Sequence, residues 1–153
     1  MTTLTLAIPA PWWLSSNQRI HRMQVAGRTK IIRAAAARAA RTIGRTFEQV
    51  HVCAFIQYPT AAKADPPNAW PTVKAMLDGL TDAGIWEDDD SKHVIATEFR
   101  REVGKSPRGE YRVRLVLTDQ DVPFAAQNTI LRDLLVHRGM PDAQIDLCLG
   151  GAS

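Results

Sequence analysis

The segment Pro71–Ala83 constrains the fold more than any other part of the sequence. Its apolar residues recur at the spacing of one helix face, and they are Val73, Met76, Leu77, Leu80 and Ala83. A proline in the first turn and Gly84 after the last turn are typical of a helix that begins and ends here. Because the apolar stripe is continuous, this helix needs other secondary structure to cover it.

Several neighbouring segments have the composition of strands. Leu4–Pro9 and Val50–Pro59 are short apolar runs that end at prolines, and the second is rich in β-branched and aromatic residues. Two later runs, HVIATEFRRE and EYRVRLVLT, flank the turn sequence VGKSPRG, and we predict that they form a hairpin. The alanine-rich segment Arg28–Arg45 predicts a further helix.

The order strand–helix–strand–helix–strand–strand predicts an α/β (α+β) fold. We expect a single domain over residues 1–118, in which a mixed sheet of about four strands carries two main helices. Asp119–Pro123 has the composition of a joint, and FAAQNTILRDLLVHRG after it predicts an amphipathic helix. A last short helix is predicted from Pro141, so residues 119–153 form a C-terminal helical extension.

Composition favours a cytoplasmic protein with no membrane span. The 153 residues contain no apolar run of about 18 residues, and MTTLTLAIPAPWW lacks the basic start of a signal peptide. The two cysteines, Cys53 and Cys148, lie far apart and form no metal-binding motif with the histidines, which suits a reducing compartment.

Basic residues concentrate in the first part of the chain. Residues 1–60 hold eight Lys and Arg and one acid, whereas the remainder holds eleven basic and fifteen acidic residues. On a helical wheel, one arc of the helix predicted over residues 28–45 carries Lys30, Arg33, Arg38, Arg41 and Arg45. The opposite side, which we expect to be core, carries Ile31, Ile32, Ala35, Ala39 and Ile43. This stripe indicates either an anionic partner or an ordinary solvated face.

Aspartates flank the helix predicted over residues 71–83. Asp65 precedes it, and Asp88, Asp89 and Asp90 follow it. Two or three carboxylates suit Mg²⁺, which would offset their repulsion and assist phosphodiester hydrolysis, and Lys74 would stabilise developing negative charge. The alternatives are a solvated turn for the aspartates and a surface ion pair for Lys74 and Asp78. A metal site also requires the chain to fold back after the helix.

The stretch DPPNAWPTVKAMLDGLTDAGIWEDDDSKHV resembles the RusA-type Holliday junction resolvases, in the form common in phages and prophages. The shared pattern is an aspartate-containing loop, a helix with K-A-x-x-D-G-L, an A-G turn, a D-D pair and a valine-bearing strand. IPAPWWLSSNQRIHR resembles the opening region of that family more loosely. The resemblance implies a homodimeric α/β endonuclease that uses Mg²⁺, with Mn²⁺ as a substitute, to nick four-way DNA junctions in bacterial or phage-infected cells.

The resemblance also assigns roles to individual residues. The family's essential lysine falls on Lys74 and its late essential aspartate on Asp89. An alignment with an inserted stretch places Asp65 on one of the two early aspartates. It leaves the other without a direct counterpart, so either Asp90 or Asp78 supplies that ligand or the metal site is reduced. We therefore expect Lys74, Asp65 and Asp89 to be catalytic. The expected metal ligands are Asp65, Asp88, Asp89 and Asp90, and the expected DNA-binding residues are Arg19, Arg22, Lys30, Arg33, Arg38, Arg41 and Arg45.

Two other functions are compatible with the sequence. The missing early aspartate suits a non-catalytic dimer that binds junctions or other nucleic acids and has lost a full metal site. A metal-dependent hydrolase of a small phosphorylated substrate would need the same carboxylates, but the cationic stripe argues against it.

Overall fold

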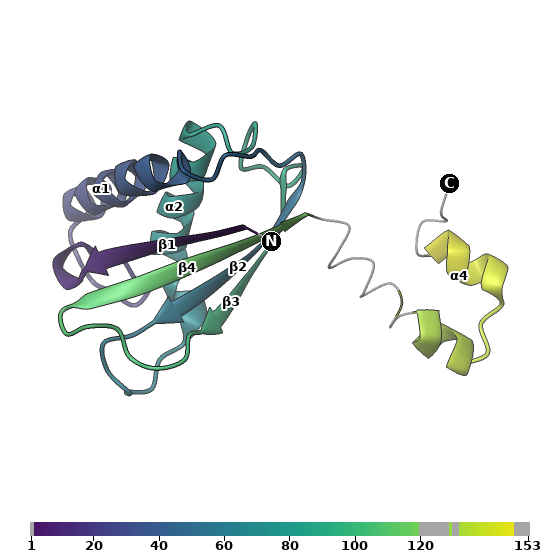
Figure 1. Ribbon diagram of the computed structural model, residues 1–153. Helices are drawn as coiled ribbons and strands as arrows, with labels where there is room; N and C mark the ends of the chain where they lie inside the picture. Colours follow the sequence, from purple (N-terminus) through teal and green to yellow (C-terminus); the bar gives the residue numbers. More distant parts are fainter. Residues whose placement is uncertain (1, 120–128, 130–131, 149–153) are drawn as a thin grey trace. The chain divides into compact units, whose positions relative to one another are not determined.

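A mixed four-stranded sheet is the centre of the fold. The computed structural model describes residues 2–119, 129 and 132–148. The strands are β1 (Thr2–Pro9), β2 (Val50–Gln57), β3 (Val94–Arg101) and β4 (Glu110–Asp119), in the order β1-β4-β2-β3. β1 pairs with β4 in antiparallel fashion and β2 pairs with β3 in parallel fashion (Figure 1). The predicted α/β class, with a four-stranded mixed sheet and two main helices, is confirmed.

The predicted hairpin of β3 and β4 is wrong, because β2 lies between these two strands. The segment that joins them crosses the end of β2 and bonds to it. Glu102 N–H donates to the Ile56 carbonyl at 2.9 Å, and Ser106 N–H donates to the Tyr58 carbonyl at 3.0 Å. Gln57 Nε2 also donates to the Val103 carbonyl at 3.0 Å. The connection is therefore a crossover stabilised by β2 rather than a tight turn.

The first main helix, α1 (Arg22–Ala40), begins and ends earlier than the predicted range of 28–45. It begins at Arg22 because His21 Nδ1 accepts a hydrogen bond from Met23 N–H at 3.2 Å and caps the first turn. The buried positions are Ile32, Ala36 and Ala40, whereas Ile31, which we expected in the core, is 40% exposed. The core face of α1 is thus rotated relative to the prediction.

The second main helix, α2 (Trp70–Asp82), follows a short 3₁₀ turn, η2 (Pro66–Ala69). Val73, Met76, Leu77 and Leu80 are buried as predicted, and they join a core that includes Val113, Leu115 and Leu117 of β4. Helices α1 and α2 pack against each other, and Figure 1 shows both on the same side of the sheet. The contact is close at Gly79, where an added Cβ would lie 2.4 Å from the Arg33 carbonyl oxygen of α1.

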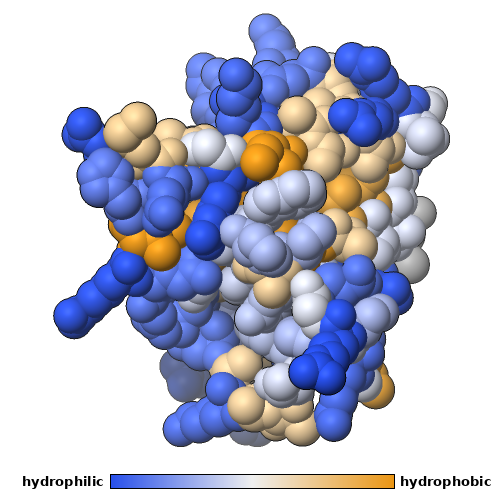
Figure 2. Space-filling view, turned by 90° about the vertical axis from the view of Figure 1, so that its left-hand side faces the viewer, coloured by the Kyte–Doolittle hydropathy of each residue, from blue (hydrophilic) through white to orange (hydrophobic). Residues whose placement is uncertain are grey.

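Seen from its left-hand side, the surface is mainly hydrophilic and encloses a smaller band of apolar side chains (Figure 2).

The chain divides into two compact units, Met1–Thr118 and Asp119–Ser153. In the second unit, α4 (Asp142–Cys148) matches the predicted last helix, and Arg132 forms an ion pair with Asp146. Of the predicted helix over residues 124–139, residues 132–137 are helical, and residues 124–128, 130 and 131 lie outside the described residues. No helix in the described part of the chain is long and apolar enough to cross a membrane.

Candidate functional site

The turn after α2 sends the chain back along the helix that it has just left. Gly84 has a φ of 73°, a left-handed conformation that suits glycine. Gly84 N–H donates to the Thr81 carbonyl at 2.9 Å and Ile85 N–H donates to the Leu80 carbonyl at 3.0 Å, which is the hydrogen-bond pattern of a Schellman motif. Ile85 and the next residue, Trp86, are buried. These anchors fix where the following aspartates emerge.

The folded-back loop brings Asp89 to the side of α2. Lys74 Nζ donates to Asp89 Oδ2 and also to Asp78 Oδ1, one helical turn further along α2. The Asp88 carboxylate accepts a hydrogen bond of 2.8 Å from Asp89 N–H. We call Lys74, Asp78 and Asp89 the lysine–aspartate cluster. The chain therefore folds back after α2, as a metal site would require, and it brings Asp89 to Lys74, fifteen positions earlier in the sequence.

Charges in the lysine–aspartate cluster stabilise one another. The hydrogen bond from Lys74 lowers the pKa of the Asp89 carboxyl, and this outweighs the opposing effect of burial. Burial lowers the pKa of Lys74, but its hydrogen bonds to Asp78 and Asp89 outweigh this, so the pKa of Lys74 is raised overall. The cluster joins one basic and two acidic side chains, so its formal charge is negative.

Arg33 extends this network from α1. Its Nε and Nη2 donate to the two carboxylate oxygens of Asp82 at 2.5 and 2.6 Å, and its Nη1 lies 3.9 Å from Asp78 Oδ2. The hydrogen bond from Arg33 lowers the pKa of the Asp82 carboxyl. Asp82, on the acidic face of α2, therefore joins α2 to α1 through this bidentate pair. Arg33 was one of the expected DNA-binding residues, and here its guanidinium is paired with Asp82.

Asp90 has different contacts from Asp89. Its Oδ1 accepts hydrogen bonds from Lys92 N–H at 2.9 Å and His93 N–H at 3.2 Å, and it lies 2.7 Å from His93 Nδ1. His93 lowers the pKa of the Asp90 carboxyl through this hydrogen bond. Asp90 therefore closes the turn that leads into β3.

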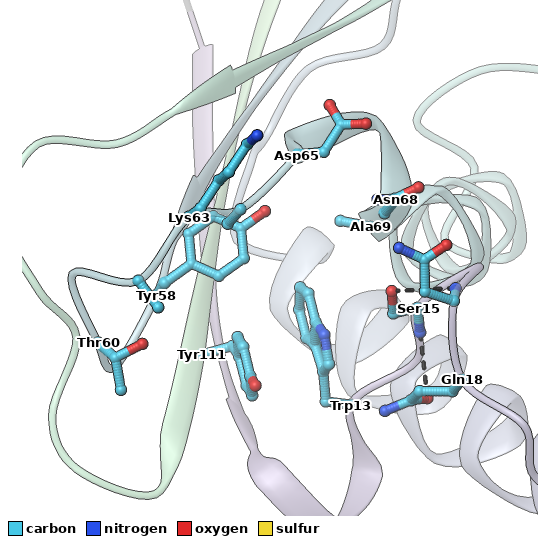
Figure 3. Close-up of a pocket in the computed structure, with 13 residues that line it drawn as sticks. Trp13, Ser15, Gln18, Tyr58, Thr60, Lys63, Asp65, Asn68, Ala69 and Tyr111 are labelled. Atoms are coloured by element: carbon cyan, nitrogen blue, oxygen red, sulfur yellow. Dashed lines mark hydrogen bonds between the residues drawn. The ribbon is translucent and has the colours of Figure 1, made fainter.

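Asp65, the remaining candidate carboxylate, borders a cavity of about 500 Å³. Figure 3 shows its carboxylate at the edge of this cavity, above the rings of Tyr58, Tyr111 and Trp13. Burial raises the pKa of Tyr58, and the nearby charge of Asp65 adds to this increase while Arg101 opposes it. Within the described residues the Asp65 side chain has neither a hydrogen bond nor an ion pair, so its oxygens are available to a ligand.

The four predicted metal ligands thus lie in different contacts. In the part of the chain that the structure describes, no three His, Cys, Asp or Glu side chains form a group that could hold a metal. The closest pair in chemical terms is Asp78 and Asp89, which converge on Lys74. Carboxylate oxygens are the ligands that Mg²⁺ prefers, and one or two of them suffice when water fills the other positions. The donor chemistry of the cluster therefore fits Mg²⁺.

All seven predicted DNA-binding side chains are exposed, namely Arg19, Arg22, Lys30, Arg33, Arg38, Arg41 and Arg45. Arg22, which precedes the range predicted for this helix, is the first residue of α1, and Arg41 caps its end. Arg45 lies beyond the helix, with its guanidinium 4.2 Å from the ring centroid of Phe47. The basic surface is therefore real but less regular than a single helix stripe.

The chain matches no protein-family model, and no curated protein is significantly similar to it. The chemistry of the site must therefore be inferred from its own residues. From the sequence, Asp78 was considered both as the surface partner of Lys74 and as a substitute for the missing early aspartate, and the structure places its carboxylate against Lys74 Nζ. The cavity beside Asp65 had no signal, because its walls come from distant segments.

Proposed function

We propose that this protein is a Mg²⁺-dependent endonuclease that resolves four-way DNA junctions by paired nicks, in the cytoplasm of a bacterial or phage-infected cell. The observation that carries the proposal is the convergence of Lys74, Asp78 and Asp89. A lysine held between two carboxylates beside a basic helix provides the charged groups that the hydrolysis of a phosphodiester requires.

The proposed roles follow from the chemistry of each side chain. Asp89 and Asp78, with Asp88 next to them, would hold Mg²⁺, and Asp65 and Asp90 remain candidates for its outer contacts. When bound, Mg²⁺ would supply a polarised water and neutralise charge on the phosphate. Lys74 would then turn from the carboxylates toward the phosphate and stabilise the negative charge that develops there.

The exposed cations suit a phosphate backbone. Lys30 and Arg38 on α1, with Arg19 in the loop before it, would contact phosphates on the arms of the junction. A four-way junction presents two phosphodiesters related by two-fold symmetry, and a homodimer with the same symmetry would cut both. The proposal therefore includes a dimeric enzyme.

The test compares a four-way junction with a linear duplex of matched sequence, each with and without Mg²⁺. We expect symmetric nicks in the junction only, and only with Mg²⁺ or Mn²⁺. Asp89→Asn and Lys74→Ala should each slow nicking by roughly 10²-fold or more, because each removes a charged group from the reacting centre. Lys105→Ala and Asp142→Asn, which change exposed charges elsewhere, are the matched controls. Wild-type rates in both site variants would refute the assigned site.

A second function is a non-catalytic junction-binding dimer. It is favoured by the contacts of the carboxylates, since Lys74 binds Asp78 and Asp89 while His93 binds Asp90. Binding to the junction that weakens steeply with salt, with no nicking in Mg²⁺ or Mn²⁺, would establish it.

A further inference from the structure

The cavity beside Asp65 has a wall of three aromatic rings. Trp13 and Tyr111 are stacked, with ring centroids 4.2 Å apart and planes inclined by 8°. Tyr58 meets Tyr111 edge to face at 6.1 Å. Trp13 is buried, whereas Tyr58 and Tyr111 are only partly buried and line the open space in Figure 3. The stacking fixes the ring planes before any ligand arrives.

Polar side chains without partners surround this wall. Asn17, Asn68 and Lys63 line the cavity, and among the described residues none of their side chains has a hydrogen-bond or ion-pair partner. Each amide offers both donors and an acceptor, and Lys63 offers a positive charge. The cavity therefore combines flat apolar surface with groups that can bind the polar edge of a planar ring.

Hydrogen bonds between distant segments hold the cavity open. Ser16 N–H donates to the Asn68 carbonyl at 2.8 Å, which joins the loop after β1 to η2. Thr72 Oγ1 of α2 accepts from Leu14 N–H at 3.1 Å and donates to the Leu14 carbonyl at 2.8 Å. Because Leu14 follows Trp13 and Thr72 is buried, the aromatic wall is tied to the helix that carries Lys74.

We propose that this cavity binds one unstacked nucleobase of a branched or single-stranded DNA, an inference that rests on the proposed action on DNA. The partly buried tyrosine rings would stack on the base, as aromatic side chains do in proteins that bind single strands. Asn17 and Asn68 would bind its edge, and Lys63 the adjoining phosphate. Its volume of about 500 Å³ is within the range of sites that bind small molecules. Bases inside a continuous duplex are stacked and cannot enter, so the cavity would select branched or single-stranded DNA over a duplex.

The test uses 2-aminopurine, a fluorescent base, placed in turn at each nucleotide that flanks the branch point of a four-way junction. The same label is placed in a matched single strand and in a linear duplex, and all are bound without divalent metal so that no cleavage occurs. The measurement is the protection of the label from quenching by acrylamide. Asn17→Ala and Lys63→Ala are the test variants, since both residues are exposed and their loss spares the core. Lys105→Ala is the charge-matched control.

We expect wild-type protein and Lys105→Ala to protect one position in the junction or the single strand, and none in the duplex. Asn17→Ala and Lys63→Ala should lose this protection and bind the same DNA about tenfold more weakly. The proposal is overturned if no position is protected, or if both test variants protect it like wild type. Nicking of the junction in Mg²⁺ without a protected base would overturn base binding by the cavity and support the endonuclease activity. A protected base without nicking would support base binding and overturn the endonuclease activity.

Discussion

Replacing Gly79 with alanine tests whether the close contact of α1 and α2 organises the fold. A methyl group at this position would lie 2.4 Å from the Arg33 carbonyl oxygen and 2.9 Å from both Ala36 Cβ and Ala37 N. Two of these three atoms belong to the α1 backbone, so no side-chain rotation can relieve the contact. To reach an ordinary separation of at least 3.4 Å, the Arg33 carbonyl would have to withdraw by about 1 Å.

Two opposing effects set the magnitude. Alanine has a higher helix propensity than glycine and would stabilise α2 by about 1 kcal/mol. Forcing a methyl group into a packed interface costs about 1–3 kcal/mol or more, and here backbone must move. Gly27 is the matched control, because it also lies inside a helix, and a methyl group added there would meet nothing within 4 Å. We expect Gly79→Ala to be less stable than wild type and Gly27→Ala to be more stable. Because both variants gain the same helix propensity, the difference between them is the cost of the contact, roughly 1–3 kcal/mol or more.

The measurement is the free energy of unfolding in urea, followed by far-ultraviolet circular dichroism for wild type and both variants. The C-terminal unit is identical in all three proteins, so its contribution cancels. If Gly79→Ala gained as much stability as Gly27→Ala, the helices would be free to separate at no cost. That result would refute the argument that their contact is fixed.

Two further predictions concern charged groups. Lys74→Met should raise the pKa of the Asp89 carboxyl toward its ordinary value of 3.8, measured by carbon-detected NMR titration. Because the pKa of Asp89 is lowered in the folded state, the Lys74–Asp89 contact stabilises the protein above pH 3.8, and this stabilisation is lost as pH falls through the lower folded pKa. An Asp89 pKa that does not change in Lys74→Met would contradict this prediction. A double-mutant cycle on Arg33 and Asp82 should give a coupling below about 1 kcal/mol, since these side chains are 46% and 42% exposed, and a larger coupling would show an unscreened pair.

Periodicity predicted α2 well and α1 poorly for a physical reason. In α2 the apolar and polar residues differ strongly, so the buried face at Val73, Met76 and Leu80 follows from spacing alone. In α1 the run of alanines provides little contrast, and the isoleucines dominated the assignment. Packing against Gly79 requires a small residue, and Ala36 meets it there. The buried face of α1 is therefore determined by its contact with α2, and the hydrophobicity of its residues alone could not identify this face.

Strand pairing shows a related limit. The turn sequence between β3 and β4 is compatible with a hairpin, and local signals contain no information on a third strand. β2 pairs with β3 in parallel fashion from Val50 to Ile56, and the crossover segment bonds to the end of β2. The same limit applies to the cavity, because Trp13, Tyr58 and Tyr111 belong to three segments that only the sheet order brings together.

The packing of α2 and the geometry of the lysine–aspartate cluster depend on one another. Gly79 directs one side of α2 toward α1, and this orientation brings Asp78 and Asp82 to Arg33 and leaves Lys74 facing the returning loop. A rotation of α2 that relieved a methyl group at position 79 would therefore shift Lys74 away from Asp89. We expect Gly79→Ala to raise the pKa of the Asp89 carboxyl, whereas Gly27→Ala should leave it unchanged. An Asp89 pKa equal in all three proteins would show that the loop follows the helix, and that the cluster is set by the turn at Gly84 alone.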